Sequence, residues 1–155
     1  MSREFVVRAR EGEFSTRNYP DESLFHFFVP VRVWDGTSFG TPHDFLWDTG
    51  ASFATVSEEF AAAHRLRYGD DDRLELDRVG GQSEGWVTTR HVEFPLVGKP
   101  RLKFKLFFFI VKAAPAAMPL LLGMPAVLQS FDVLTSTTGA VFRLKAGHAG
   151  DAIAT

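Results

Sequence analysis

A single short segment carries the residues whose types and spacing suit acid–base chemistry. Asp48, Thr49 and Gly50 follow the apolar residues 45–47, so a carboxylate stands where a strand is expected to turn. Gly50 permits a positive φ or the close approach of another chain, and the Thr49 hydroxyl can hydrogen-bond to a neighbouring loop. Desolvation by Phe45, Trp47 and Phe53 would make an isolated charge at Asp48 costly. This carboxylate is therefore expected to have a partner.

An ordinary turn would explain the same three residues. Asp48 would then accept a hydrogen bond from the backbone two residues further on, as aspartates in turns commonly do. The tripeptide alone favours that structural interpretation. The predicted elements on either side of the tripeptide are needed to distinguish an ordinary turn from an active site.

The rest of the chain predicts a domain built mostly from short strands. Aromatic and β-branched residues gather in segments that are bounded by turn-forming residues. The expected strands cover residues 24–34, 39–42, 44–47, 53–56, 74–79, 86–94, 102–111, 120–122, 131–135 and 140–144. Two short helices are expected, one from the cap residue Ser57 to about Arg65 and one over residues 125–130. Many short strands at regular spacing indicate a mostly β domain with barrel-like or sandwich-like closure.

The motif and its surroundings together resemble a known family, the retropepsin-like aspartic proteases of retroviruses and their bacterial relatives. Residues 48–52, with the sequence Asp-Thr-Gly-Ala-Ser, resemble the active-site signature of that family. An apolar strand precedes them, and residues 53–57 with a short helix follow. The hairpin with Gly80, Gly81 and Gly85 resembles the flap of the family.

A second landmark lies further along the chain. Residues 120–124 (Leu-Leu-Leu-Gly-Met), followed by a short helix and residues 131–133, are similar to the apolar pair and glycine that lie beneath the catalytic loop in the family. The resemblance covers residues 24–144. It implies a mostly β, closed, barrel-like acid protease fold with one or two short helices.

The resemblance also implies a role for each matching residue. Asp48 would be the catalytic residue, Thr49 would hydrogen-bond to its mate in a second subunit, and the Gly50 backbone N–H would orient the carboxylate. The expected active-site support consists of Thr49, Gly50, Ala51, Ser52 and Gly123, and the expected flap and substrate-binding residues are Gly80, Gly81, Gln82, Ser83 and Trp86. A tryptophan in a hairpin is more often simple packing, which is the other interpretation of Trp86.

Hydrolysis of an amide by carboxyl groups needs an ionised group and a protonated one, which share a proton at close range. The chain contains one Asp-Thr-Gly and no internal repeat. Asp44 lies in the same strand as Asp48, and Asp132 follows Phe131 without a glycine turn, so neither is placed to oppose Asp48. We therefore expect the second carboxylate to be Asp48 of another copy, brought face to face by a two-fold axis.

Three departures from retroviral members affect this expectation. Met124 and Pro125 stand where those enzymes commonly have an arginine and an acid or amide that brace the dimer. Ser52 takes a position often held by an acid. The C-terminal tail is not strand-like, whereas the viral dimer interleaves its terminal strands. These features resemble a bacterial relative more than a viral enzyme.

Composition excludes several other classes of function. The 155-residue chain has a net charge of −2 and shows no basic patch typical of a nucleic-acid-binding protein. It has no cysteine, and its five histidines lack metal-ligand spacing, so no metal site and no cofactor are expected. The uninterrupted apolar run at residues 106–111 is far shorter than the roughly 20 residues of a membrane span. The sequence therefore predicts a soluble, cytoplasmic protein with no nucleic-acid or membrane partner.

The resulting hypothesis is an aspartic endopeptidase that acts as a homodimer on polypeptides. The alternative is a non-catalytic module of the same fold that dimerises or binds peptides. The expected organisation is an N-terminal extension over residues 1–23 that could add a strand, a protease domain over residues 24–145, and a flexible tail over residues 146–155.

Overall fold

The structure, a computed structural model, describes residues 4–14, 16–78, 81–95, 102–115, 118–128, 131–136, 138–144 and 153–154. The strands are β1 (Glu4–Phe14), β2 (Glu22–Val33), β3 (His43–Asp48), β4 (Ala54–Ser57), β5 (Arg73–Arg78), β6 (Gly81–Phe94), β7 (Leu102–Val111), β8 (Leu121–Gly123), β9 (Phe131–Ser136), β10 (Gly139–Leu144) and β11 (Ile153–Ala154). The helices are α1 (Glu58–Ala63), α2 (Met124–Leu128) and the 3-10 turn η1 (Asp70–Asp72). The predicted mostly β fold with short helices is confirmed.

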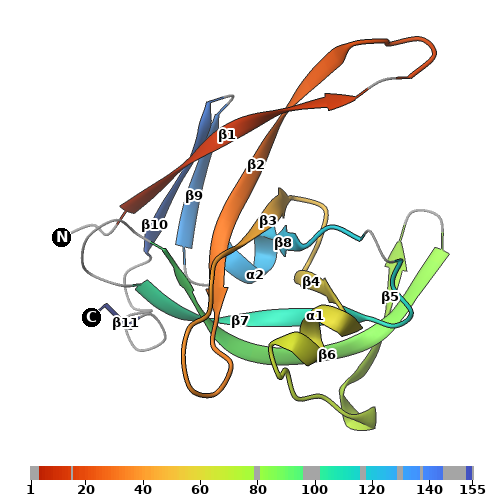
Figure 1. Cartoon of the computed structure of the whole chain (residues 1–155), viewed down its shortest axis with the longest axis vertical. Coiled ribbons are helices and arrows are strands. Elements are labelled where there is room, and N and C mark those ends of the chain that lie inside the picture. Colours follow the sequence, from red (N-terminus) through yellow and green to blue (C-terminus); the bar gives the residue numbers. More distant parts are fainter. Residues whose placement is uncertain are drawn as a thin grey trace.

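Six of these strands close into a barrel. The pairing runs β6-β7-β4-β8-β3-β2, and β2 pairs back onto β6 through Arg32 and Val33. Figure 1 shows the long β6 and β7 crossing below the short strands β3, β4 and β8. The closure leaves β3 and β8 in the interior of the sheet, where both of their edges are paired.

A second group of strands extends the sheet from β2. The first half of β1 pairs with β10, and its second half pairs with β2, with Ala9 opposite Phe27 and Phe14 opposite Glu22. The β1–β2 hairpin extends well beyond the barrel in Figure 1. Residues 4–14 of the expected N-terminal extension thus form a strand. The tail was not expected to be strand-like, but its residues Ile153 and Ala154 form β11 and pair with β7. The division of the chain into an extension, a domain and a tail stays a prediction.

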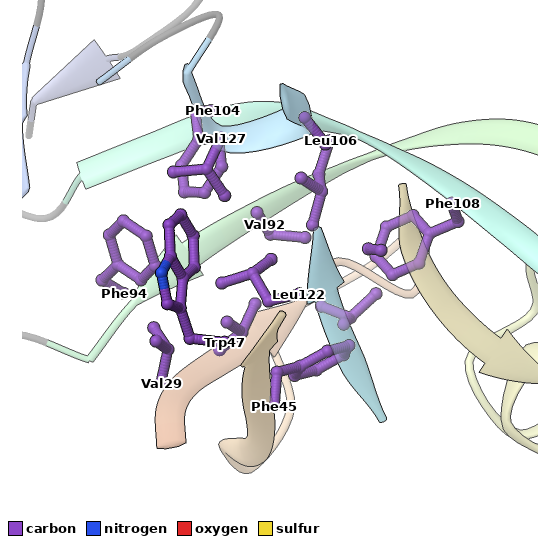
Figure 2. Close-up of a cluster of buried hydrophobic side chains, with 14 of the residues drawn as sticks. Val29, Phe45, Trp47, Val92, Phe94, Phe104, Leu106, Phe108, Leu122 and Val127 are labelled. Carbon is purple, nitrogen blue, oxygen red and sulfur yellow. The ribbon is translucent and has the colours of Figure 1, made fainter. Parts of the chain in front are cut away.

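Aromatic packing explains the high phenylalanine content. Phe94, Phe104, Phe131 and Phe142 are buried, and neighbouring rings among them lie 4.9 to 6.4 Å apart between centroids. Figure 2 shows Phe94 and Phe104 with Trp47, Val92 and Leu122 in the same cluster. Aromatic pairs at these separations add to the stabilisation that comes from removing apolar surface from water.

Local signals account for some element boundaries. The Ser57 hydroxyl accepts a hydrogen bond from the Phe60 N–H at 3.1 Å, which confirms the predicted cap of α1. The strand at residues 102–111 has the predicted bounds. The strand expected over residues 39–42 is reduced to a single bridge between Trp34 and Phe39, since Pro42 has no N–H to donate to a ladder.

Among the described residues, the chain has no helix that is both long enough and apolar enough to cross a membrane.

Candidate active site

Strand β3 places Asp48 at its last residue. Phe45 and Trp47 are buried, with 0% and 8% of their surface exposed, whereas Leu46 and Asp48 are half-buried. Because successive side chains of a strand point to opposite faces, the aromatic pair packs into the core while Asp48 lies on the other face. The expectation that Phe45 and Trp47 desolvate Asp48 is therefore wrong, because both side chains anchor the strand from the core and do not cover the carboxylate.

The backbone after β3 turns around the Asp48 side chain. The Gly50 N–H donates to Asp48 Oδ1 at 2.8 Å, and the Ala51 N–H donates to the Asp48 carbonyl at 3.3 Å. The first of these contacts is the one through which Gly50 would orient the carboxylate. An ordinary aspartate turn would form the same hydrogen bond, so the surroundings of the turn matter more than the bond.

Gly123 lies beneath this turn. In the parallel pairing of β3 with β8, Gly123 stands opposite Asp48, and its N–H donates to the Phe53 carbonyl at 3.1 Å. A Cβ atom at Gly123 would lie 2.4 Å from the Phe53 oxygen and 2.5 Å from the Ala51 oxygen. Only glycine lets the backbone of β8 come this close to the loop that follows Asp48.

A cleft of about 390 Å³ opens over the turn. Its lining consists of Asp48, Gly50, Ala51, Ser52, Phe53, Thr55, Leu76, Asp77 and Leu121. Leu76 and Asp77 belong to β5, so this cleft joins the Asp48 loop to the hairpin that was expected to be the flap. The lining is apolar at Phe53, Leu76 and Leu121, and it includes the carboxylates of Asp48 and Asp77.

The β5–β6 hairpin holds part of the expected flap. Asp77 pairs with Gln82 across the hairpin, and Gln82 Nε2 donates to Asp77 Oδ1 at 3.2 Å. Gly81 has a φ of +135°, which side-chain-bearing residues rarely adopt. Ser83 pairs with Leu76 further down the hairpin. Gly80 lies outside the described residues.

The other predicted site residues take different positions. Thr49 and Ser52 are exposed at the turn, where a second molecule could reach them. The Trp86 ring packs against Tyr68, with 5.0 Å between ring centroids, and contacts the hydrophobic core. Thr49 and Ser52 thus lie beside Asp48, whereas Trp86 lies at the base of the hairpin among packed side chains.

Neither of the two alternative carboxylates lines the Asp48 cleft. Asp44 forms an ion pair with Arg10 of β1 at 3.2 Å. Asp132 lies on β9, opposite Arg143 of β10. Among the described residues no group of three or more metal-ligating side chains gathers in one place.

Sequence reasoning missed four residues of the cleft wall, namely Thr55, Leu76, Asp77 and Leu121. Leu76 and Asp77 are far from Asp48 in sequence, and only the closure of the barrel brings their hairpin to the turn. The alternation of residues 74–79 predicted a strand, but it could not show which face of that strand would meet the cleft.

Comparisons with known proteins agree with this geometry at the level of the fold. No protein-family model matches the sequence, and no curated protein sequence matches it. The fold is similar to the crystal structure of a retropepsin-like aspartic protease from Rickettsia conorii, with a TM-score of 0.54. The two chains are 16% identical, and the match covers 93% of each. The chain therefore has a retropepsin-like aspartic protease fold.

Proposed function

We propose that this protein is an aspartic endopeptidase whose active site forms when two copies bring their Asp48 carboxylates together. The observation that carries the proposal is the position of Asp48. It ends an interior strand, it accepts the Gly50 N–H, and it opens onto a cleft that the β5–β6 hairpin also lines. An isolated turn would not need this arrangement of loop, cleft and hairpin.

The chemistry follows from two carboxyl groups that share a proton. One ionised Asp48 takes a proton from water, and the protonated Asp48 of the second copy hydrogen-bonds the carbonyl oxygen of the scissile peptide. Two carboxylates at close range cannot both ionise cheaply, so the pair titrates as a unit. A shared proton of this kind is well established for aspartic proteases in general. In this protein the pair would arise from the single Asp-Thr-Gly of each chain.

The surroundings of Asp48 are compatible with contact between two copies. Asp48 is half-buried, and Thr49 and Gly50 are exposed. A second turn related by a two-fold axis would place each residue opposite its own equivalent. Thr49 could then hydrogen-bond to the partner's loop. Specific dimers bury about 1,200–2,000 Å² in total, and such a contact would need further surface outside the turn.

The substrate in this proposal is an extended polypeptide. Phe53, Leu76 and Leu121 offer apolar walls for side chains, and the hairpin would close over the bound segment and exclude water. Closure of this kind would be carried by the tip with Gly81, Gln82 and Ser83. A non-catalytic peptide-binding module would use the same walls, so binding alone does not distinguish the two functions.

The experiment compares cleavage by the wild type, Asp48→Asn and the matched control Asp44→Asn. Each protein is incubated with a mixture of denatured polypeptides from acidic to neutral pH, with and without pepstatin, and its mass is measured by light scattering. The proposal predicts pepstatin-sensitive cleavage by a dimeric wild type and by Asp44→Asn, and none by Asp48→Asn. Equal inactivity of all three dimeric proteins would favour the binding module, and cleavage by Asp48→Asn would exclude this active site.

A further inference from the structure

A second cavity, separate from the Asp48 cleft in its lining residues, gathers three arginines. It has a volume of about 420 Å³ and is lined by Trp34, Asp35, Gly36, Thr37, Arg65, Arg67 and Arg90. Cavities that bind small molecules commonly have volumes of about 300–1,000 Å³. Three guanidinium groups against one carboxylate leave an excess of two positive charges, in a chain whose net charge is −2.

Arg90 of β6 holds together the two segments that line this cavity, namely the loop after β2 and the segment after α1. Its Nη1 donates to the Trp34 carbonyl at 2.7 Å and to the His64 carbonyl at 3.5 Å, and its Nη2 donates to the Arg65 carbonyl at 2.5 Å. Hydrogen bonds from the Arg90 side chain therefore connect these two segments. Burial, and next the positive charge of Arg67, lower the pKa of Arg90.

The segment that carries the other two arginines is held in place by its backbone. Thr88, two residues before Arg90 on the same face of β6, donates its hydroxyl to the Arg67 carbonyl at 2.7 Å. Leu66 is buried between two exposed arginines, and Arg65 has a φ of +54°, a conformation that costs energy outside glycine. The backbone at Arg65 and Arg67 is therefore positioned before any ligand arrives.

One oxygen of the carboxylate in the cavity is occupied by its own loop. Asp35 Oδ1 accepts hydrogen bonds from the Thr37 N–H, the Thr37 hydroxyl and the Ser38 N–H at 2.8 to 2.9 Å. The backbone N–H groups of Ser38 and Thr37 lower the pKa of Asp35 to about 2. Among the described residues, neither Arg65 nor Arg67 has an ion pair through its guanidinium. Their donors remain for an external anion.

We infer that this cavity, which we call the arginine cavity, binds an organic oxyanion, with Arg65 and Arg67 as the ligand-contacting residues and Arg90 as a positioning residue. Guanidinium groups match the planar geometry of carboxylate and phosphate oxygens. The Trp34 indole, which packs on Phe39 with 5.1 Å between ring centroids, adds an apolar wall for the organic part of the ligand. This site does not depend on the catalytic proposal.

The test titrates isotope-labelled protein with citrate or sodium phosphate, and with sodium chloride at equal ionic strength. The indole N–H resonance of Trp34 reports on the cavity, and that of the buried Trp47 serves as the internal reference. The expected result is a saturable shift at Trp34 with citrate or phosphate, while chloride causes none. The two titrations show whether carboxylate or phosphate is preferred. An equal response to chloride, or no response at Trp34, would overturn the inference.

Variants locate the binding groups. Arg65→Gln and Arg67→Gln should each weaken binding about tenfold, whereas Arg17→Gln, an exposed arginine in the β1–β2 connection, should leave it unchanged. Asp35→Asn keeps an acceptor oxygen for the turn and removes the opposing charge, so it should tighten binding severalfold. Equal affinities in the Arg65, Arg67 and Arg17 variants, or unchanged affinity in Asp35→Asn, would refute the site. Asp48→Asn should bind as the wild type does, which separates this test from the catalytic one.

Discussion

Asp48 and Gly123 face each other at the ends of two parallel strands, and the backbone of Gly123 supports the loop that orients the Asp48 carboxylate. The two residues are register partners of β3 and β8, while the Gly123 N–H binds the Phe53 carbonyl at 3.1 Å. The position of the Asp48 carboxylate thus depends on the hydrogen bond between the Gly123 N–H and the Phe53 carbonyl, which involves backbone atoms alone.

Gly123→Ala should damage both stability and cleavage. The new methyl would lie 2.4 Å from one backbone oxygen and 2.5 Å from another, and neither can move without shifting the loop after Asp48. Overpacking of this kind costs about 1–3 kcal/mol. Urea unfolding and peptide cleavage measure the two effects. Gly40→Ala is the control, because a Cβ there meets nothing within 4 Å, and equal stability of the two variants would contradict the packing described here.

Gly81→Ala tests the hairpin tip as a flap. Gly81 (φ +135°) and Gly36 (φ +109°) both adopt conformations that disfavour alanine, and an added Cβ meets no atom within 4 Å at either. Each substitution should therefore cost about 1–2 kcal/mol of unfolding free energy. Only Gly81→Ala should also lower kcat/KM for peptides, since Gly36 lies outside the Asp48 cleft. A similar loss of cleavage in both variants would remove the case for a flap.

Asp77→Asn separates a specificity role from a catalytic one. Asp77 shares the cleft with Asp48 and lies on the hairpin, where its charge would favour substrates with a basic side chain. Loss of the charge should lower kcat/KM for lysine- and arginine-containing peptides severalfold and leave neutral peptides unaffected. Sequencing of cleaved peptides by mass spectrometry measures this, with Asp71→Asn in the exposed turn as the control. If neutral peptides also cease to be cleaved, Asp77 belongs to the catalytic pair.

His64 should make the fold less stable in mild acid. Burial, and next the charge of His43, lower the pKa of His64 from 6.5, and the two rings lie 4.8 Å apart. Below pH 6.5 the unfolded chain therefore binds a proton that folded His64 does not. The free energy of unfolding falls as pH decreases, until the lowered pKa is passed.

The variant His64→Phe keeps the ring that packs on Phe60 and removes the titration. Its free energy of unfolding, measured in urea between about pH 5 and 8, should depend less on pH than that of the wild type. His91→Phe, at an exposed position of β6, should keep the wild-type dependence. A parallel pH dependence in the wild type and His64→Phe would show that His64 does not cause it.

Several parts of this structure could be predicted from local sequence. The Ser57 cap, the strand at residues 102–111 and the turn after Asp48 are each specified by neighbouring residues. The closed barrel was predicted from the resemblance to the family, whose landmarks occur in the same order along this chain. Local patterns therefore located the carboxylate and the strand that carries it.

Features that depend on distant pairing could not be predicted in the same way. The long β1 pairs with β10 near the opposite end of the chain. Asp77 reaches the Asp48 cleft only through the barrel, and the arginine cavity combines the loop after β2, the segment after α1 and strand β6. Charge spacing and periodicity do not predict these contacts, because the contacts depend on how strands that are distant in sequence pair with one another.

The most direct measurement mixes active and inactive subunits. A fixed amount of wild type is incubated with increasing Asp48→Asn protein until subunits have exchanged, and peptide cleavage is then measured. If each active site needs Asp48 from two copies, an equal amount of the variant should reduce cleavage to roughly half, and larger amounts should reduce it further. Cleavage that stays constant in spite of demonstrated exchange would contradict an active site shared between two copies.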